Sequence, residues 1–164
     1  MEDTKSIYFT SRKNYIKSFL LREHEWYIYK FQKLLRKEEK AKLYLIKMYY
    51  RCRKNMLGRK LGFTIPAGTF DEDLHIWHFG NVVINGYARI GKGCILHGDN
   101  CIGNDGKSEL CPVIGNNVDI GVGAKLLGDI VIADDIVIAA GAVVVSSFME
   151  TGITIGGVPA KRIK

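Results

Sequence analysis

The chain has 164 residues, of which 47% are hydrophobic and 25% charged, and its formal net charge is +7. This length supports one domain with an appendage, the composition is ordinary for a soluble protein, and no stretch reaches the roughly 18 uninterrupted apolar residues of a membrane span. The first residues lack the basic start and apolar stretch of a secretory signal, so we expect a cytoplasmic protein.

The charge is divided unequally along the chain. Residues 1–62 contain 17 Lys and Arg against 6 Asp and Glu, a net of +11, whereas residues 63–164 contain 7 against 11, a net of −4. We therefore expect two regions, a basic N-terminal region over residues 1–61 and a second region over residues 62–164.

The N-terminal region predicts α-helices. Apolar and aromatic residues recur there at mixed spacings of three and four, with basic residues between them. We expect two helices with a break near residues 37–40, the second ending at Gly58 or Gly62 and stopped by Pro66. A helical cap over the next region is the favoured role, packed against neighbouring subunits. Peripheral membrane association is the alternative, and nucleic acid is not expected as a partner.

From residue 84 onward an aliphatic residue recurs at every sixth position. The series is Ile84, Ile90, Leu96, Ile102, Ile114, Ile120, Leu126, Ile132, Ile138 and Val144, with one slot skipped at Ser108. A six-residue period is typical of a parallel β-helix whose flat faces each take one hexad, so that three hexads close a triangular coil. The predicted fold class is therefore mainly β, a hexapeptide solenoid preceded by a short α-helical region.

Other hexad positions support this fold. The fifth position is small or apolar and should point inward, as at Ala88, Cys94, Val118, Ala124, Ile130, Ile136 and Ala142. Glycine often follows the aliphatic residue, and we expect it there to adopt the backbone conformations of the corners: Gly91, Gly103, Gly115 and Gly121. The polar stretch 104–110 predicts a loop outside the coil.

The four cysteines, at positions 52, 94, 101 and 111, show no metal-ligand spacing. We interpret them as reduced thiols. Cys111, at the end of the polar loop, is the candidate for a nucleophile, but a small buried thiol is the favoured interpretation.

Residues 62–164 resemble the left-handed β-helix hexapeptide acyltransferases. The resemblance is carried by the His-x-Gly of residues 78–80, the hexads, the GxGAxxxG pattern of residues 121–128 and the closing GGVPAKRIK. Within that family the sequence is most similar to serine acetyltransferases and to relatives that O-acetylate sugars in polysaccharide pathways. The resemblance implies a homotrimer that uses acetyl-CoA and requires no metal.

His78 matches the catalytic histidine of that family. An alcohol attacks a thioester efficiently only when a general base takes its proton, and imidazole suits this role near neutral pH. His78 lies six residues before Ile84, which predicts a prism edge where a second subunit can close the site. His97, about one coil later, is expected near the same groove as a substrate-binding residue. His75 should share neither the face nor the exposure of His78, and His24 should be a surface residue.

Departures from serine acetyltransferases point to the acceptor. Those enzymes carry an acid directly before the catalytic histidine, another acid fifteen residues upstream and a second histidine after the loop. This chain has Trp77, Phe63 and Cys111 in those places. An amino acid needs charged partners, whereas Trp77 offers a flat apolar face for a sugar ring. We therefore expect a sugar or polysaccharide precursor as acceptor, with serine O-acetylation as the alternative.

Acetyl-CoA should lie in a groove between adjacent solenoids. Gly103, Gly123 and Ala140 match family positions that line this groove. Lys161 and Arg162 form a basic pair in a region of net negative charge and are expected to meet the nucleotide phosphates. A non-enzymatic alternative is a structural solenoid whose basic helices dock to a membrane-bound assembly.

Overall fold

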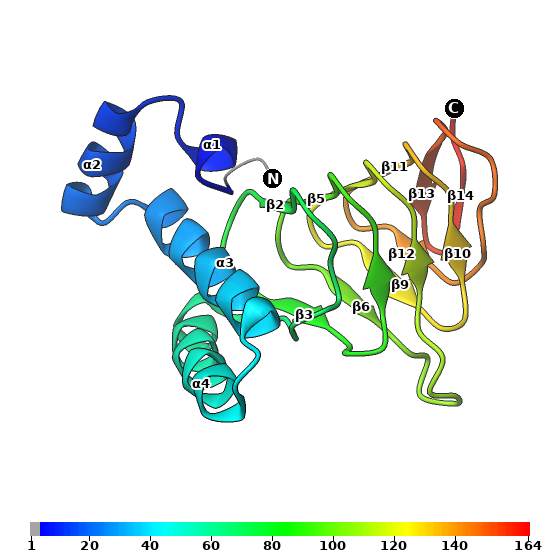
Figure 1. The fold of residues 1–164 in the computed structure, drawn as a ribbon. Helices are drawn as coiled ribbons and strands as arrows, with labels where there is room; N and C mark the ends of the chain where they lie inside the picture. Colours follow the sequence, from blue (N-terminus) through cyan, green and yellow to red (C-terminus); the bar gives the residue numbers. More distant parts are fainter. Residues whose placement is uncertain (1–3) are drawn as a thin grey trace.

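The computed structural model describes residues 4–164 as a group of helices followed by a stack of β-coils (Figure 1). The helices are α1 (Thr4–Tyr8), α2 (Arg12–Leu21), α3 (His24–Lys40) and α4 (Tyr44–Leu61). The strands are β1 (Phe63–Thr64), β2 (His75–Ile76), β3 (Val82–Ile84), β4 (Arg89–Ile90), β5 (Ile95–Leu96), β6 (Cys101–Gly103), β7 (Val113–Ile114), β8 (Asp119–Ile120), β9 (Lys125–Leu127), β10 (Val131–Ile132), β11 (Val137–Ile138), β12 (Val143–Val144), β13 (Thr154–Gly157) and β14 (Ala160–Arg162).

The strands form three sheets, one on each face of a triangular prism. Their orders are β1-β3-β6-β9-β12, β10-β7-β4 and β14-β13-β11-β8-β5-β2. Pairing is parallel apart from β14, which runs antiparallel to β13. Lys125 pairs with Val143, eighteen residues later, so three hexads make one coil. The predicted left-handed parallel β-helix is confirmed.

The interior of the prism is filled by the two residue sets that the hexads predict. All ten aliphatic residues from Ile84 to Val144 and all seven residues at the fifth positions are at most 3% exposed. Each fully buried aliphatic side chain contributes roughly 1.5–3 kcal/mol relative to an exposed one. The stacked interior therefore supplies most of the driving force that holds the coils together.

The glycines that follow the aliphatic residues have a different role from the one predicted. The four glycines at positions 91, 103, 115 and 121 do not have a left-handed φ. A Cβ on Gly121 would instead lie 2.6 Å from the backbone nitrogen of Ala140 on the next coil. Successive coils approach too closely for a side chain at Gly91, Gly115 and Gly121, whereas a Cβ on Gly103 would meet Asn85 only at 3.4 Å. The left-handed conformation occurs further along the turn, for example at Gly123 with φ +75°.

The polar stretch 104–110 leaves the coil as a loop, as predicted. Across it, Cys101 pairs with Lys125 and Ile95 pairs with Asp119, each twenty-four residues later. This separation exceeds the eighteen residues of the later coils by one hexad. The loop therefore occupies the skipped slot without shifting the register of the strands.

The structure has four helices in residues 4–61 where two were predicted. The prediction missed α1 and α2. The side chain of Ser11 caps the start of α2 by accepting a backbone hydrogen bond, and Arg22, in the left-handed conformation, ends it. The break before α4 falls at residues 41–43, just after the predicted one, and Gly62 ends α4 as predicted. Within residues 4–164, no helix has both the length and the hydropathy of a transmembrane span.

The helices cap the open end of the β-helix. β1 and β2 lie at the ends of their sheets, so their outer backbone groups lack a strand partner. Gln32 donates a hydrogen bond to the carbonyl of Leu74 at 2.9 Å. The hydroxyl of Tyr8 accepts one from the backbone N–H of Ile76, also at 2.9 Å. Residues 4–61 therefore cover the first coil as predicted, and their packing against neighbouring subunits stays a prediction.

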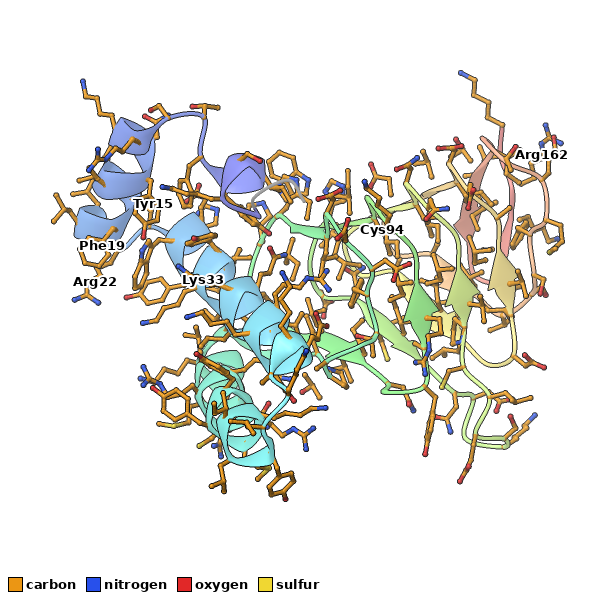
Figure 2. All side chains as sticks on the ribbon, viewed as in Figure 1. Tyr15, Phe19, Arg22, Lys33, Cys94 and Arg162 are labelled. Carbon is orange, nitrogen blue, oxygen red and sulfur yellow. The ribbon has the colours of Figure 1, made fainter. Side chains whose placement is uncertain are left out.

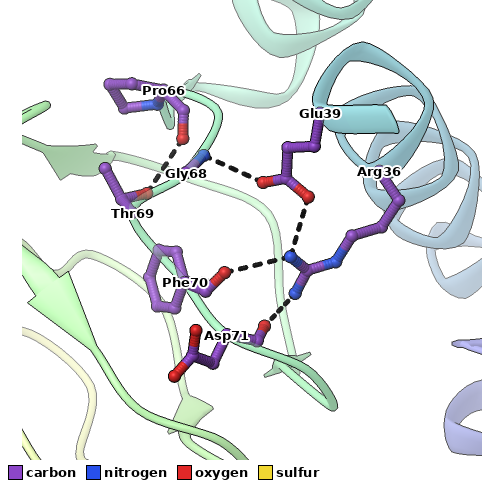
Figure 3. A network of polar contacts seen from close by, with 7 residues as sticks. All are labelled: Arg36, Glu39, Pro66, Gly68, Thr69, Phe70 and Asp71. Atoms are coloured by element: carbon purple, nitrogen blue, oxygen red, sulfur yellow. Dashed lines mark hydrogen bonds and ion pairs between the residues drawn. The ribbon is translucent and has the colours of Figure 1, made fainter. Parts of the chain in front are cut away.

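Polar contacts also hold α3 against the segment 66–71 (Figure 3). The guanidinium of Arg36 donates to the carbonyls of Phe70, at 3.0 Å, and Asp71. It also pairs with Glu39 at 2.9 Å, and Glu39 accepts a hydrogen bond from the backbone N–H of Gly68. Because α3 is fixed to the first coil in this way, the residue at its start, His24, has a defined position beside the coil.

Candidate active site

The turn between β2 and β3 carries His78 and is two residues longer than the equivalent turn of the next coil. Ile76 pairs with Leu96, and Val83 pairs with Cys101. Ile76 and Val83 are therefore seven positions apart, whereas Leu96 and Cys101 on the next coil are only five apart. The extra residues bulge from the coil and leave His78 exposed at a prism edge, where it was predicted.

Aromatic rings form a ladder across β2 and β5. The indole of Trp77 stacks against His75, with ring centroids 4.7 Å apart, and against His97, with centroids 6.1 Å apart. Tyr8 closes the ladder, edge-on to His75 at 5.1 Å. Trp77 is 46% exposed, so the ladder is a surface open to ligands. Trp77 and His97 thus lie together, and their role in binding a substrate stays a prediction.

His75 lies at the inner end of this ladder. It is half-buried, whereas His78 is exposed, so the two differ in environment as predicted. Burial, followed by the charge of His97, lowers the pKa of His75. Burial therefore favours the neutral form of His75 in its stack on Trp77.

A carboxylate orients His97. Its Nε2 lies 2.8 Å from Oδ1 of Asp119 on β8, and both side chains are 38% exposed. This contact fixes the ring and leaves Nδ1 available to a ligand. The sequence prediction missed Asp119. The hexad register could have predicted its position, because Asp119 and Ile120 pair with Ile95 and Leu96 on the adjacent strand, directly before His97.

His24, the first residue of α3, also belongs to this region. Its ring stacks on that of His78, with centroids 5.5 Å apart and planes 29° from parallel. Its Nε2 lies 3.3 Å from Oε1 of Glu25. His24 was predicted as a surface residue of the helical region, and its contact depends on how the cap sits on the coil. All four histidines of the chain therefore gather around the bulged turn.

Two of the predicted cofactor residues, Gly123 and Ala140, lie on the same prism edge as His78. On the second coil this edge is occupied by Gly98, where a Cβ would lie 3.5 Å from the carbonyl oxygen of His78. The turns of the third and fourth coils carry Gly123 and Ala140. A Cβ on Gly123 would meet no atom closer than 3.8 Å. Small residues therefore occupy this prism edge on successive coils.

The other predicted cofactor residues lie further away within one chain. Gly103 ends β6 and lies at the next prism edge, beside the polar loop. Lys161 and Arg162 lie on β14, at the end of the stack opposite the helices, as the label of Arg162 shows in Figure 2. Arg162 pairs with Glu150 at 2.7 Å. Five strand spacings of about 4.8 Å separate β2 from β14, roughly 24 Å along one face.

Cys111 does not have the environment of a nucleophile. It is 7% exposed, and burial raises the pKa of its thiol, so the reactive thiolate is disfavoured. Cys94 points into the prism as predicted, where burial raises its pKa to about 11. Within residues 4–164, no three His, Cys, Asp or Glu side chains come together as candidate metal ligands.

Known proteins share both sequence and fold with this chain. No protein-family model matches it. It is 38% identical over 100 residues to the serine acetyltransferase of Helicobacter pylori strain J99, which covers 60% of this chain and 58% of that protein. It is 33% identical over 97 residues to a protein of Escherichia coli strain K12 assigned to colanic acid biosynthesis as an acetyltransferase, covering 58% and 60%.

A solved structure extends the similarity to the helices. The serine acetyltransferase of Neisseria gonorrhoeae in complex with serine matches with a TM-score of 0.72 at 26% identity, over 99% of this chain and 66% of that chain. The chain spans about three fifths of the length of the two curated relatives above. These similarities confirm the resemblance to serine acetyltransferases and their hexapeptide-repeat relatives.

Proposed function

We propose that the protein transfers an acetyl group from acetyl-CoA to a hydroxyl of a sugar or polysaccharide precursor. The observation that carries the proposal is the exposed Trp77 ladder directly beside His78 on the bulged turn. Acetyl transfer is supported by the names of the relatives, and a saccharide acceptor by the Escherichia coli relative. The expected polysaccharide pathway and cytoplasmic location belong to this proposal.

His78 is the proposed general base. It accepts the proton of the acceptor hydroxyl as the hydroxyl oxygen bonds to the acetyl carbon, and it returns the proton to sulfur when the carbon–sulfur bond breaks. Its exposure at the prism edge gives both substrates access to the ring. No covalent acyl-enzyme is needed, in agreement with the buried state of Cys111.

The aromatic ladder is the proposed acceptor platform. Trp77 offers its ring face to the apolar side of a sugar ring. His97, held by Asp119, offers Nδ1 to a sugar hydroxyl at the border of the same surface. This arrangement recognises a flat, uncharged and hydroxyl-rich acceptor.

The groove for acetyl-CoA runs along the prism edge that carries the small residues. Gly123 and Ala140 leave room for the pantetheine arm, which needs space and exposed backbone. The basic pair Lys161 and Arg162 lies about 24 Å from β2, a separation in the range of an extended cofactor. Glu150 holds Arg162 in the free protein, so phosphate binding would compete with that ion pair.

A homotrimer completes this site. In one chain His78 and Trp77 are open to solvent, and Gly103 lies on a different prism edge. A neighbouring subunit related by rotation would bring its own edge to the groove, and closed rings follow from such heterologous contacts. We expect light scattering to give three times the chain mass. A fully active monomer would contradict the shared site.

Serine O-acetylation is the second candidate function. It is favoured by the similarity to the Helicobacter pylori and Neisseria gonorrhoeae enzymes. Against it, Trp77 stands where serine acetyltransferases present an acid, and the nearest carboxylate shown on the ladder, that of Asp119, is already paired with His97. A zwitterion bound there would be desolvated without full pairing, which costs roughly several kcal/mol per ion.

Acceptor specificity separates the two candidates. We expect release of free CoA with members of a panel of mono- and oligosaccharides, and little release with L-serine. Trp77→Ala should raise the KM for the acceptor about tenfold, equivalent to about 1.4 kcal/mol, because stacking area is lost on the acceptor side. The same change should leave the affinity for acetyl-CoA intact. Tyr44→Ala, which removes an exposed aromatic ring at the start of α4, is the matched control. Efficient turnover of L-serine with no response to any saccharide would reverse the ranking.

A further inference from the structure

Helix α4 points its apolar side away from the protein. Leu45 is 80% exposed and Met56 is 52% exposed, whereas Lys54 is 3% exposed. At 100° per residue, a single side of the helix, opposite Lys54, carries Leu45, Met48, Tyr49, Cys52 and Met56. We call these five residues the α4 outer face. In Figure 2 the side chains of α4 radiate into solvent along much of its length.

The surroundings of the α4 outer face are basic. Residues 40–70 contain eight Lys and Arg and no Asp or Glu. By the same helical geometry, Arg53 and Lys60 flank one side of the outer face, and Arg59 lies on the face itself, near its C-terminal end. The acidic partner of this helix, Glu38, is 1% exposed and lies on the opposite, inner side with Lys54. A ligand approaching from outside therefore meets apolar side chains bordered by positive charge.

We propose that the α4 outer face docks on an anionic membrane surface. Helices that lie in a membrane interface combine an apolar stripe with Lys and Arg at its borders, and tyrosine is common at that depth. Each basic residue near an anionic leaflet adds attraction. Pairing of two α4 helices from separate copies would instead bring two strongly basic segments together, which argues against a second copy as the occupant.

Docking would place the bulged turn at a fixed height above the lipid surface. The N–H of Gly80 donates to the carbonyl of Leu61 at 2.9 Å, and the N–H of Val82 donates to that of Gly62 at 3.0 Å. The C-terminal end of α4 is thereby joined to the turn that carries His78. The docking itself depends on α4 alone and not on the proposed acetyl transfer.

The test is cosedimentation of the full chain with vesicles. We expect the chain to bind vesicles containing phosphatidylglycerol, not vesicles of phosphatidylcholine alone, and to bind less as salt is raised. The double variant Leu45→Glu/Met56→Glu should bind anionic vesicles at least tenfold more weakly. Both side chains are more than half exposed, so the fold should be retained, and circular dichroism checks this.

The control variant is Tyr87→Glu/Met149→Glu, which adds the same two negative charges at exposed apolar positions on the coil. It should bind anionic vesicles as the unmodified chain does. Equal binding to both kinds of vesicle, or none to either, would overturn the proposal. A double variant that lowers the mass in light scattering, while the unmodified chain ignores vesicles, would show that another copy covers the α4 outer face. None of these results depends on catalytic activity.

Discussion

Replacement of His78 by alanine is expected to lower the turnover of acetyl transfer by about 10²- to 10⁴-fold, the usual effect of losing a general base. The side chain is exposed on a bulged turn and supports no buried contact, so stability and acetyl-CoA affinity should change little. The measurement is the rate of free CoA release at saturating substrates, together with the affinity for acetyl-CoA. Added imidazole should restore part of the lost rate if the missing group is a base.

Two other imidazoles serve as matched controls. His24→Ala removes the ring that stacks on His78, and His97→Ala removes the ring held by Asp119. Each should reduce turnover less than His78→Ala. If His78→Ala kept more than a tenth of the wild-type turnover while His97→Ala abolished it, the general base would be the pair of His97 and Asp119.

The β-helix could be predicted from the sequence because its period is a direct consequence of its geometry. Each face needs one inward aliphatic residue, so the hexads gave both the coil length and the skipped slot at Ser108. The role of Gly121 could not be read in the same way. A glycine required by close approach of the next coil looks identical in sequence to one required by a left-handed φ.

The residues of the candidate site also differ in how far the sequence predicts their positions. Trp77, His78 and His97 follow from the register of the coils, and the structure brings them together. His24 lies fifty-four residues before His78, and their contact depends on the seating of α3 against the first coil. Side-chain periodicity inside a helix does not specify where that helix lies on a neighbouring element. Contacts between the cap and the coil are therefore the part that only the structure provides.

That seating depends on a buried ion pair between α3 and α4. Nζ of Lys54 lies 3.0 Å from Oε2 of Glu38 and donates to the carbonyl of Ile65 at 3.0 Å. Arg51 reaches the other carboxylate oxygen of Glu38 at 2.7 Å. Burial acts to raise the pKa of Glu38, but the hydrogen bonds and charges of Arg51 and Lys54 outweigh it, and the pKa lies below its ordinary value.

Lys54→Met is expected to lower the free energy of unfolding by about 3–5 kcal/mol, because it leaves a buried carboxylate with one partner fewer. Methionine keeps a similar length, so the loss reports the charge and its hydrogen bonds more than a cavity. Chemical denaturation at pH 7, followed by circular dichroism, measures the difference. If the helices unfold in a separate transition from the coil, the lowered free energy of unfolding should appear in the transition of the helices.

The pH dependence tests whether charge is the cause. A lowered pKa means that the contribution of Glu38 is present at neutral pH and is lost as the pH falls through that pKa. In the Lys54→Met chain the buried Glu38 carboxylate is unfavourably charged at pH 7, and protonation removes this charge. The difference in free energy of unfolding between this variant and the unmodified chain should therefore become smaller as the pH falls. The double variant Glu38→Gln/Lys54→Met should recover part of the loss at pH 7. A difference that stays constant with pH and is not reduced by the second substitution would mean that packing, rather than the ion pair, holds the cap to the coil.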